Sequence, residues 1–193
     1  MFEVHRLRFG YPGKPLLLRG LSFKLQPEDK MLILGENGSG KSTLLKLLCG
    51  RLQPDGGQIR RMSRRNYFYL PQKADRRILG INLEQDLMLW EMAGLDTERL
   101  RRDALVADFA PEFWQIPLYE LSAGTKQAYL LAIALSHDAD FLVLDEPYPA
   151  LDKRRQEIFT SRLAKQKGLI LVSHQIPEMD FDAQILLGDR SKP

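Results

Sequence analysis

The segment GENGSGKST, residues 35–43, has the residue types and spacing of a phosphate-binding loop. Gly35, Gly40, Lys41 and Ser42 match the pattern G-x-x-x-x-G-K-[ST], in which glycines let backbone N–H groups close around phosphate oxygens. Lys41 would reach the β- and γ-phosphates, and the Ser42 hydroxyl would ligate Mg²⁺. A glycine turn with a chance lysine is the alternative. The predicted ATP contacts are Gly35, Glu36, Asn37, Gly38, Ser39, Gly40, Lys41, Ser42 and Thr43.

Two adjacent carboxylates, Asp145 and Glu146, end the buried run FLVLDEP. Open α/β sheets place their ligand crevice at the carboxyl ends of such strands. We expect Asp145 to hold Mg²⁺ through water, and Glu146 to orient and deprotonate the attacking water. Asp-Glu-Pro alone could simply cap a strand and start a turn. Together with the glycine loop, it predicts ATP hydrolysis.

Alternating buried strands and helices must position these groups. MLILG, residues 31–35, is a buried strand that leads into the glycine loop, and the helix STLLKLLCGRL follows it. FLVLD and LILVS are further buried strands, with a helix from Lys153 between them. Residues 2–9 and 16–25 alternate like the strands of an antiparallel layer. The pattern predicts an α/β fold with a mainly parallel sheet covered on both faces.

Residues 73–120 have polar and apolar residues at helical spacing, which predicts a helical insert. We therefore expect one domain, residues 1–193, divided into two parts. Residues 1–72 and 121–193 form the nucleotide-binding core with its β layer, and residues 73–120 form a helical subdomain.

Composition and charge exclude several classes of protein. The 193 residues are 44% hydrophobic and 27% charged, and no apolar run approaches the roughly 20 residues that span a bilayer. A net charge of +3 is too mild to predict a nucleic-acid partner. A cluster of arginines indicates a solvated face more simply than an anionic-lipid or nucleic-acid surface; its members are Arg51, Arg60, Arg61, Arg64, Arg65, Arg76 and Arg77.

The segment LSAGTKQ, residues 121–127, lies shortly before FLVLDEP, and ALD follows at residues 150–152. With a histidine after the next strand, this order resembles the nucleotide-binding subunits of ATP-binding-cassette (ABC) transporters. The likeness covers nearly the whole chain and does not depend on the glycine loop, which many NTPases share. It implies a P-loop ABC ATPase fold, two ATP molecules sandwiched between two ABC subunits, and an integral membrane transport subunit as partner.

The resemblance implies three further site residues. Tyr11 would stack on adenine, although it could instead pack on its own turn. Gln72 would contact Mg²⁺ and the reacting water. His174, the one histidine expected where a strand exits toward the crevice, would contact the γ-phosphate.

Ser122 and Gly124 are implied to face the ATP held by the other subunit. The alternative is that Ser122 is only an ordinary N-cap of a buried helix, which would use the same residues. Ala123 and Thr125 depart from the family's signature sequence, Leu-Ser-Gly-Gly-Gln. The signature of this chain, LSAGTKQ, is therefore expected to act less well on the ATP held by its partner.

The stretch 72–102 resembles the ATPases of energy-coupling-factor uptake systems, and compact exporter ATPases remain an alternative. We expect a membrane subunit to dock near residues 73–95, with Leu87, Leu89, Trp90 and Met92 as contacts or, equally, as core residues. The expected location is cytoplasmic, peripheral at the inner face of the cell membrane, in a homodimer or heterodimer.

The alternative function is a soluble, non-transport ABC ATPase acting on nucleic acid, the ribosome or cluster assembly. A binding-only cassette is disfavoured by Glu146 and His174. Because the sequence ends soon after His174, no C-terminal regulatory function is expected.

Overall fold

A computed structural model describes residues 1–61, 67–73, 77–103, 106 and 109–188. Arg64, Arg65 and Arg76 of the arginine cluster lie outside these residues. The chain forms two compact units. The first comprises Met1–Tyr69, Ala139–Glu146 and Gln166–Pro193; the second comprises Leu70–Asp138 and Pro147–Lys165. The assignment of residues 73–120 as the helical subdomain stays a prediction.

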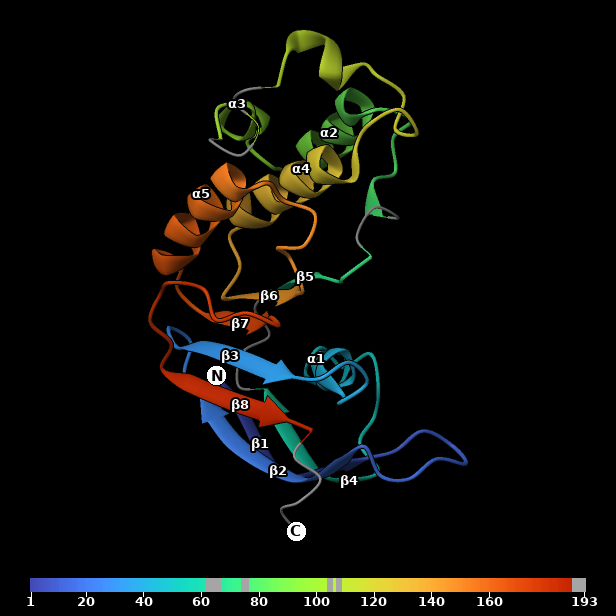
Figure 1. The fold of residues 1–193 in the computed structure, drawn as a ribbon, viewed down its shortest axis with the longest axis vertical. Helices are drawn as coiled ribbons and strands as arrows, with labels where there is room; N and C mark the ends of the chain where they lie inside the picture. Colours follow the sequence, from blue (N-terminus) through green and yellow to red (C-terminus); the bar gives the residue numbers. More distant parts are fainter. Residues whose placement is uncertain (62–66, 74–76, 104–105, 107–108, 189–193) are drawn as a thin grey trace. The chain divides into compact units, whose positions relative to one another are not determined.

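A five-stranded sheet is the centre of the first unit (Figure 1). Its order is β5-β6-β7-β3-β8, and the pairings of β3 with β7, of β3 with β8 and of β6 with β7 are parallel. Runs such as LILV in β7 are buried at every position, as parallel strands require. The mainly parallel sheet is therefore confirmed. Its strands are β3 (Lys30–Gly35), β5 (Tyr67–Leu70), β6 (Phe141–Asp145), β7 (Leu169–Val172) and β8 (Ala183–Leu187).

A second, three-stranded sheet in the same unit is antiparallel, with the order β2-β1-β4. It consists of β1 (Phe2–Phe9), β2 (Leu18–Leu25) and β4 (Gly56–Arg61). The first two strands were expected from alternation. β4 was not, because Pro54, Gly56 and Gly57 resemble the end of the preceding helix.

The helix α1 (Lys41–Leu48) packs against β3 and β6, and its leucines are fully buried. One apolar cluster joins the inner face of the antiparallel layer to α1 and the five-stranded sheet. This core supports the start of α1, and therefore the glycine loop that leads into it.

The second unit is helical. It contains α2 (Leu83–Met92), α3 (Thr97–Arg101), the short 3₁₀ helix η2 (Pro111–Trp114), α4 (Ala123–Ser136) and α5 (Lys153–Ala164). The helix expected at residues 122–136 is confirmed as α4, which is buried on all sides from Ala128 to Leu135. None of the described helices has the length and apolar character needed to cross a membrane.

Candidate functional site

The residues predicted to act on ATP in the first unit lie at one edge of the five-stranded sheet. Ile33 of β3 and Asp145 of β6 both pair with Val172 of β7. Because these strands are parallel, their carboxyl ends meet at the same edge. The glycine loop follows β3, Glu146 follows β6 and His174 follows β7 closely. The fold thus gathers three segments that are far apart in the sequence.

The glycine loop has a backbone conformation that only glycine adopts without strain. Gly35, Gly38 and Gly40 have φ of 151°, 81° and 106°. A Cβ at Gly35 would lie 2.2 Å from the Leu187 carbonyl oxygen and 2.6 Å from Ser39 Oγ. No side chain caps α1 at Gly40, so its first N–H groups are available to an anion.

Lys41 is held against the loop that precedes it. Its Nζ donates to the carbonyl oxygens of Gly35 at 2.7 Å and Glu36 at 3.1 Å, and lies 3.7 Å from Glu146 Oε1. The side chain is 7% exposed. An ammonium has three N–H donors, so one remains for a phosphate oxygen.

Ser42 and Asp145 fit an Mg²⁺ site. Their side chains are hydrogen-bonded, and burial is the main cause of a raised Asp145 pKa. Asp145 Oδ1 is buried without a hydrogen-bond partner among the described residues, as are Ser39 Oγ and Glu146 Oε1. Native proteins rarely leave such atoms unpaired unless a ligand or ion is expected there. The described residues contain no group of three or more His, Cys, Asp or Glu side chains that could hold a metal. Phosphates and water would therefore complete the coordination, as is usual for Mg²⁺.

Replacement of Asp145 by asparagine should stabilise the protein without nucleotide. Burial raises the pKa of Asp145 in the folded state, so the ionised carboxylate opposes folding once the pH is above both its folded and unfolded pKa. A neutral amide removes this cost. We expect an increase in Tm of about 2–4 °C at pH 7, corresponding to about 1 kcal/mol. The increase should shrink as the pH falls through the folded pKa of Asp145, because protonation then removes the buried charge from the parent chain as well. A lower Tm at pH 7 would contradict the prediction.

Glu146 combines burial with a strained backbone. Its φ is 53°, a region that a residue with a long side chain seldom adopts, and its N–H donates to the Val172 carbonyl oxygen at 3.0 Å. His174 Nε2 lies 3.0 Å from Glu146 Oε1, although the two do not form a hydrogen bond. Strain of this kind is concentrated at functional sites. The carboxylate, the imidazole and the Lys41 ammonium therefore form one compact cluster.

Tyr11 lies beside the loop, as the adenine prediction requires. Its hydroxyl is 3.1 Å from Thr43 Oγ1, and its ring makes an edge contact with Phe9 at 5.1 Å between centroids. Tyr11 as a whole is 38% exposed, so part of its surface remains available for stacking. The same contacts suit the alternative of a tyrosine that packs on its own loop. Adenine stacking remains a prediction.

The signature residues begin α4 in the second unit. Ser122 is its N-cap, and its Oγ accepts from the N–H of Thr125 at 3.1 Å and lies 2.8 Å from the Thr125 hydroxyl. A Cβ at Gly124 would lie 2.7 Å from the Ala150 carbonyl oxygen, so glycine is required for this close approach. Ala123 is exposed. The serine cap is confirmed locally, whereas the role of Ser122 and Gly124 toward a second ATP stays a prediction.

Gln72 is exposed and lies two residues after β5, in the second unit. Its proposed contact with Mg²⁺ and water stays a prediction. Sequence reasoning missed the support that β8 gives to the glycine loop. Gly35 is in register with Leu187, and a Cβ at Gly188 would lie 3.2 Å from Ser39 Cβ. The glycine that ends β8, in the segment AQILLGD, was the available signal.

Comparisons with known proteins place these features in one family. The chain matches the ABC transporter family over residues 18–149. It is 31% identical over 204 residues to the energy-coupling factor transporter ATP-binding protein EcfA1 of Thermotoga maritima, covering 96% of this chain and 78% of that protein.

A second relative and a solved structure resemble the chain over different shares of their own lengths. ABC transporter F family member 3 of Arabidopsis thaliana is 33% identical over 170 residues, which cover 86% of this chain but only 23% of the plant protein. The dimeric structure of the ATP-binding cassette MJ0796 bound to ADP and Pi superposes with a TM-score of 0.81 at 20% identity, covering 98% of this chain and 95% of the cassette. At that identity the likeness shows the fold alone.

Proposed function

This chain belongs to the ABC transporter family, and from that premise we propose that it is the ATP-hydrolysing subunit of a transporter whose membrane-spanning subunit is a separate chain. The observation that carries the proposal is the cluster of Lys41, Glu146 and His174 beside the hydrogen-bonded pair of Ser42 and the buried Asp145. ATP is the substrate, and Mg²⁺ held by Ser42 and Asp145 would neutralise phosphate charge.

Each residue of the cluster has a proposed task in hydrolysis. Lys41 and the free N–H groups at the start of α1 bind the phosphates. Glu146 orients a water molecule and accepts its proton during attack on the γ-phosphorus, and ADP leaves. His174, 3.0 Å from the carboxylate, donates to the γ-phosphate. Gln72 would contact Mg²⁺ and the same water.

The complete site is proposed to need two ABC subunits. The N-terminal end of α4, with Ser122 and Gly124, would bind the ATP held by the partner subunit. ATP binding then closes the dimer, and hydrolysis opens it again. Ala123 places a methyl group at this end of the helix, so in a heterodimer the partner's site is proposed to be the weaker of the two.

The transport subunit is proposed to dock on the second unit, with this chain at the inner face of the membrane. Leu87, one of the expected contacts, is only 2% exposed and belongs to the core of the unit. Met92 is 85% exposed, and Leu89 is also exposed. Trp90 donates to Asp86 Oδ2 at 3.0 Å and is half-buried. Large apolar side chains exposed together are typical of a protein interface.

Replacement of Met92 by glutamate tests the docking surface. A charge on an exposed apolar contact should prevent copurification with the integral membrane partner that the parent chain retains when it is purified from membranes. It should leave Tm unchanged because the side chain is solvated. Leu186→Glu is the control, because Leu186 is 70% exposed on β8 in the first unit. Copurification that survives Met92→Glu, or is lost equally in the control, contradicts this docking site.

The alternative of a soluble ATPase acting on nucleic acid, the ribosome or cluster assembly is less favoured. The transporter relative is matched over 78% of its length, against 23% for the F family protein. The membrane partner, rather than this chain, is expected to determine the transported substrate.

A further inference from the structure

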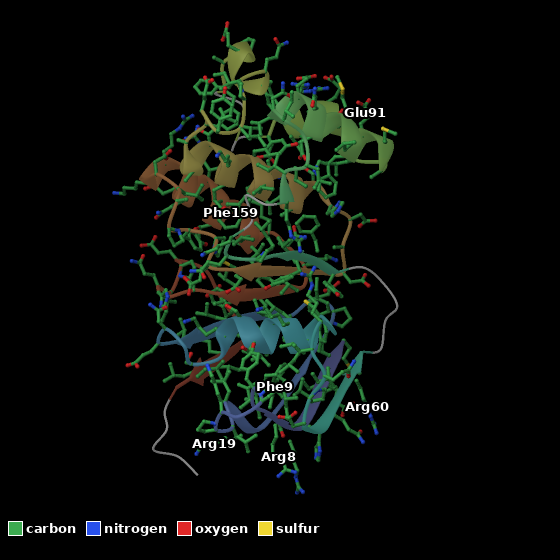
Figure 2. The ribbon with its side chains drawn as sticks, turned by 90° about the vertical axis from the view of Figure 1, so that its right-hand side faces the viewer. Arg8, Phe9, Arg19, Arg60, Glu91 and Phe159 are labelled. Carbon is green, nitrogen blue, oxygen red and sulfur yellow. The ribbon has the colours of Figure 1, made fainter. Side chains whose placement is uncertain are left out.

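The outer face of the antiparallel layer is basic, and its cations are not neutralised within the described structure. Arg8 pairs across the strands with Arg19, and Glu3 pairs with both Lys24 and Arg60. Figure 2 shows Arg8, Arg19 and Arg60 projecting from this layer. None of these cations forms an ion pair with a described residue. Arg8 and Arg19 therefore lie side by side on this face without an ion-pair partner among the described residues.

A bulge in β1 adds a further arginine to this face. The apolar residues of β1 change phase between Val4 and Leu7, and the register shifts at the same point. His5 and Arg6 are consequently both exposed, while Leu7 is fully buried. The bulge thus keeps Leu7 in the core and at the same time brings Arg6 to the basic face.

The core explains why β1 is bulged, but it does not explain why arginine occupies the bulge. Arg6 has φ of 46°, a backbone conformation that glycine or asparagine adopts readily and that is strained for a residue with a long side chain. Its N–H donates to Ser22 Oγ at 2.8 Å, which helps to hold the conformation. A strained arginine that projects to the surface indicates a use for its guanidinium.

Glycines on the two neighbouring strands form a hollow beside this arginine. A Cβ at Gly20 would meet no atom within 4 Å, and a Cβ at Gly56 would lie 3.0 Å from Arg8 Nε. The hollow has a volume of about 760 Å³. It is lined by Glu3, His5, Arg6, Arg8, Gly20, Gly57, Gln58 and Arg60. Three guanidinium groups therefore surround one concave site, opposed by a single carboxylate.

We propose that this arginine hollow binds a phosphate group that carries two or more negative charges, as part of a free phosphate compound or of a phosphorylated lipid headgroup. A guanidinium binds two oxygens at once, and three of them around a concave site match oxygens that point in several directions. A phosphate offers such oxygens, whereas a carboxylate presents one planar edge. The site is separate from the glycine loop, with which it shares no lining residue.

The test uses inorganic pyrophosphate as the probe, in calorimetry on a Lys41→Ala background that weakens phosphate binding at the glycine loop. Arg8→Ala/Arg60→Ala should weaken pyrophosphate binding by about tenfold or more, because two charge-assisted contacts are lost. Lys153→Ala/Lys165→Ala removes the same charge from two exposed positions, the first residue of α5 and its C-cap, and should have no effect. Equal weakening in both variants, or no binding of pyrophosphate at all, overturns the proposal.

Arg6→Gly separates binding from folding. Glycine relieves the strain at φ 46°, so Tm should rise while pyrophosphate binding falls. Parental affinity in this variant would overturn the assigned site. Citrate should bind more weakly than pyrophosphate. Equal affinity for the two anions would show that the hollow attracts negative charge without selecting phosphate, and would overturn the proposal.

A second arm identifies the source of the phosphate. Vesicles of phosphatidylcholine with a phosphoinositide phosphate are sedimented with the Lys41→Ala chain, and vesicles of phosphatidylcholine with phosphatidylglycerol, whose phosphate carries one charge, serve as control. Sedimentation only with the phosphoinositide, lost in Arg8→Ala/Arg60→Ala, supports the lipid source. Pyrophosphate binding without vesicle binding supports a free phosphate compound. If the Lys41→Ala chain sediments with both kinds of vesicle, and the added Arg8→Ala/Arg60→Ala change does not prevent this, the lipid source is overturned.

Discussion

The Glu146→Gln variant is expected to hydrolyse ATP about 10²–10⁴-fold more slowly than the parent chain while still binding ATP. Glutamine preserves the shape of the side chain and the Lys41 contact at 3.7 Å, but its amide cannot accept the proton of the attacking water. The Lys41 ammonium and the free start of α1 are unchanged, so phosphate binding survives. Phosphate release and ATP affinity measured on the same preparation separate the two effects.

The same variant should also reveal the second subunit. Since hydrolysis reopens the proposed dimer, Glu146→Gln should accumulate as an ATP-bound dimer in light scattering with Mg-ATP. Glu157→Gln, the same change at an exposed position of α5, is the control and should behave as the parent chain. Parental turnover would remove Glu146 from catalysis. A variant that stays monomeric with ATP and all candidate partners present would refute the two-subunit mechanism.

The Asp86→Ala variant is expected to destabilise the second unit by about 3 kcal/mol, because it leaves several buried donors unpaired. Asp86 is 1% exposed. Its Oδ1 accepts from the N–H of Leu79 at 2.6 Å, and its Oδ2 accepts from Trp90 Nε1 at 3.0 Å and from the Tyr129 hydroxyl at 2.8 Å. The carboxylate thus joins α2, α4 and the segment before α2.

Tyr129 provides the matched control for this carboxylate. Burial and the neighbouring Asp86 raise the pKa of the Tyr129 phenol, so it stays a donor throughout the neutral range. Tyr129→Phe removes one donor and leaves Asp86 with its other partners, so we expect a loss of only about 1 kcal/mol. Asp86→Asn should fall between the two variants, because an amide nitrogen cannot accept from Trp90.

Tryptophan fluorescence during urea unfolding measures these losses selectively. The chain has two tryptophans, Trp90 and Trp114, and both belong to the second unit. The fluorescence midpoint should fall furthest for Asp86→Ala. An unchanged midpoint in that variant would show that the carboxylate does not hold the unit together.

Local sequence patterns were sufficient for the glycine loop and for most strands and helices. The loop at residues 35–43 is determined by glycine torsions and by the order strand, loop and helix, which involve only neighbours in the chain. The buried strands β6 and β7 follow from unbroken apolar runs. The family resemblance likewise followed from motif order, which the sequence contains in full, and the comparisons bear it out.

β4 and the bulge in β1 show where local patterns were insufficient. β4 begins with two glycines, which normally end an element, and it becomes a strand because β1 offers a partner. Gly57 fits there because a Cβ would lie 2.3 Å from the Arg6 carbonyl oxygen. The break in the apolar–polar alternation of β1 is visible in the sequence. Whether a bulge or a turn forms at that break depends on contacts with two other strands.

The sequence by itself determined which residues could act on ATP, and only the tertiary structure decided how they meet. Asp145 and Glu146 could be identified from FLVLDEP, yet the φ of 53° at Glu146 and its approach to Lys41 and His174 depend on strands that pair across long stretches of chain. The hydrogen bond between Asp86 and Tyr129, which is 43 residues away, had no local signal. Torsional preference and periodicity act between neighbours in the sequence, whereas burial, strain and hydrogen bonding of side chains arise from neighbours in space.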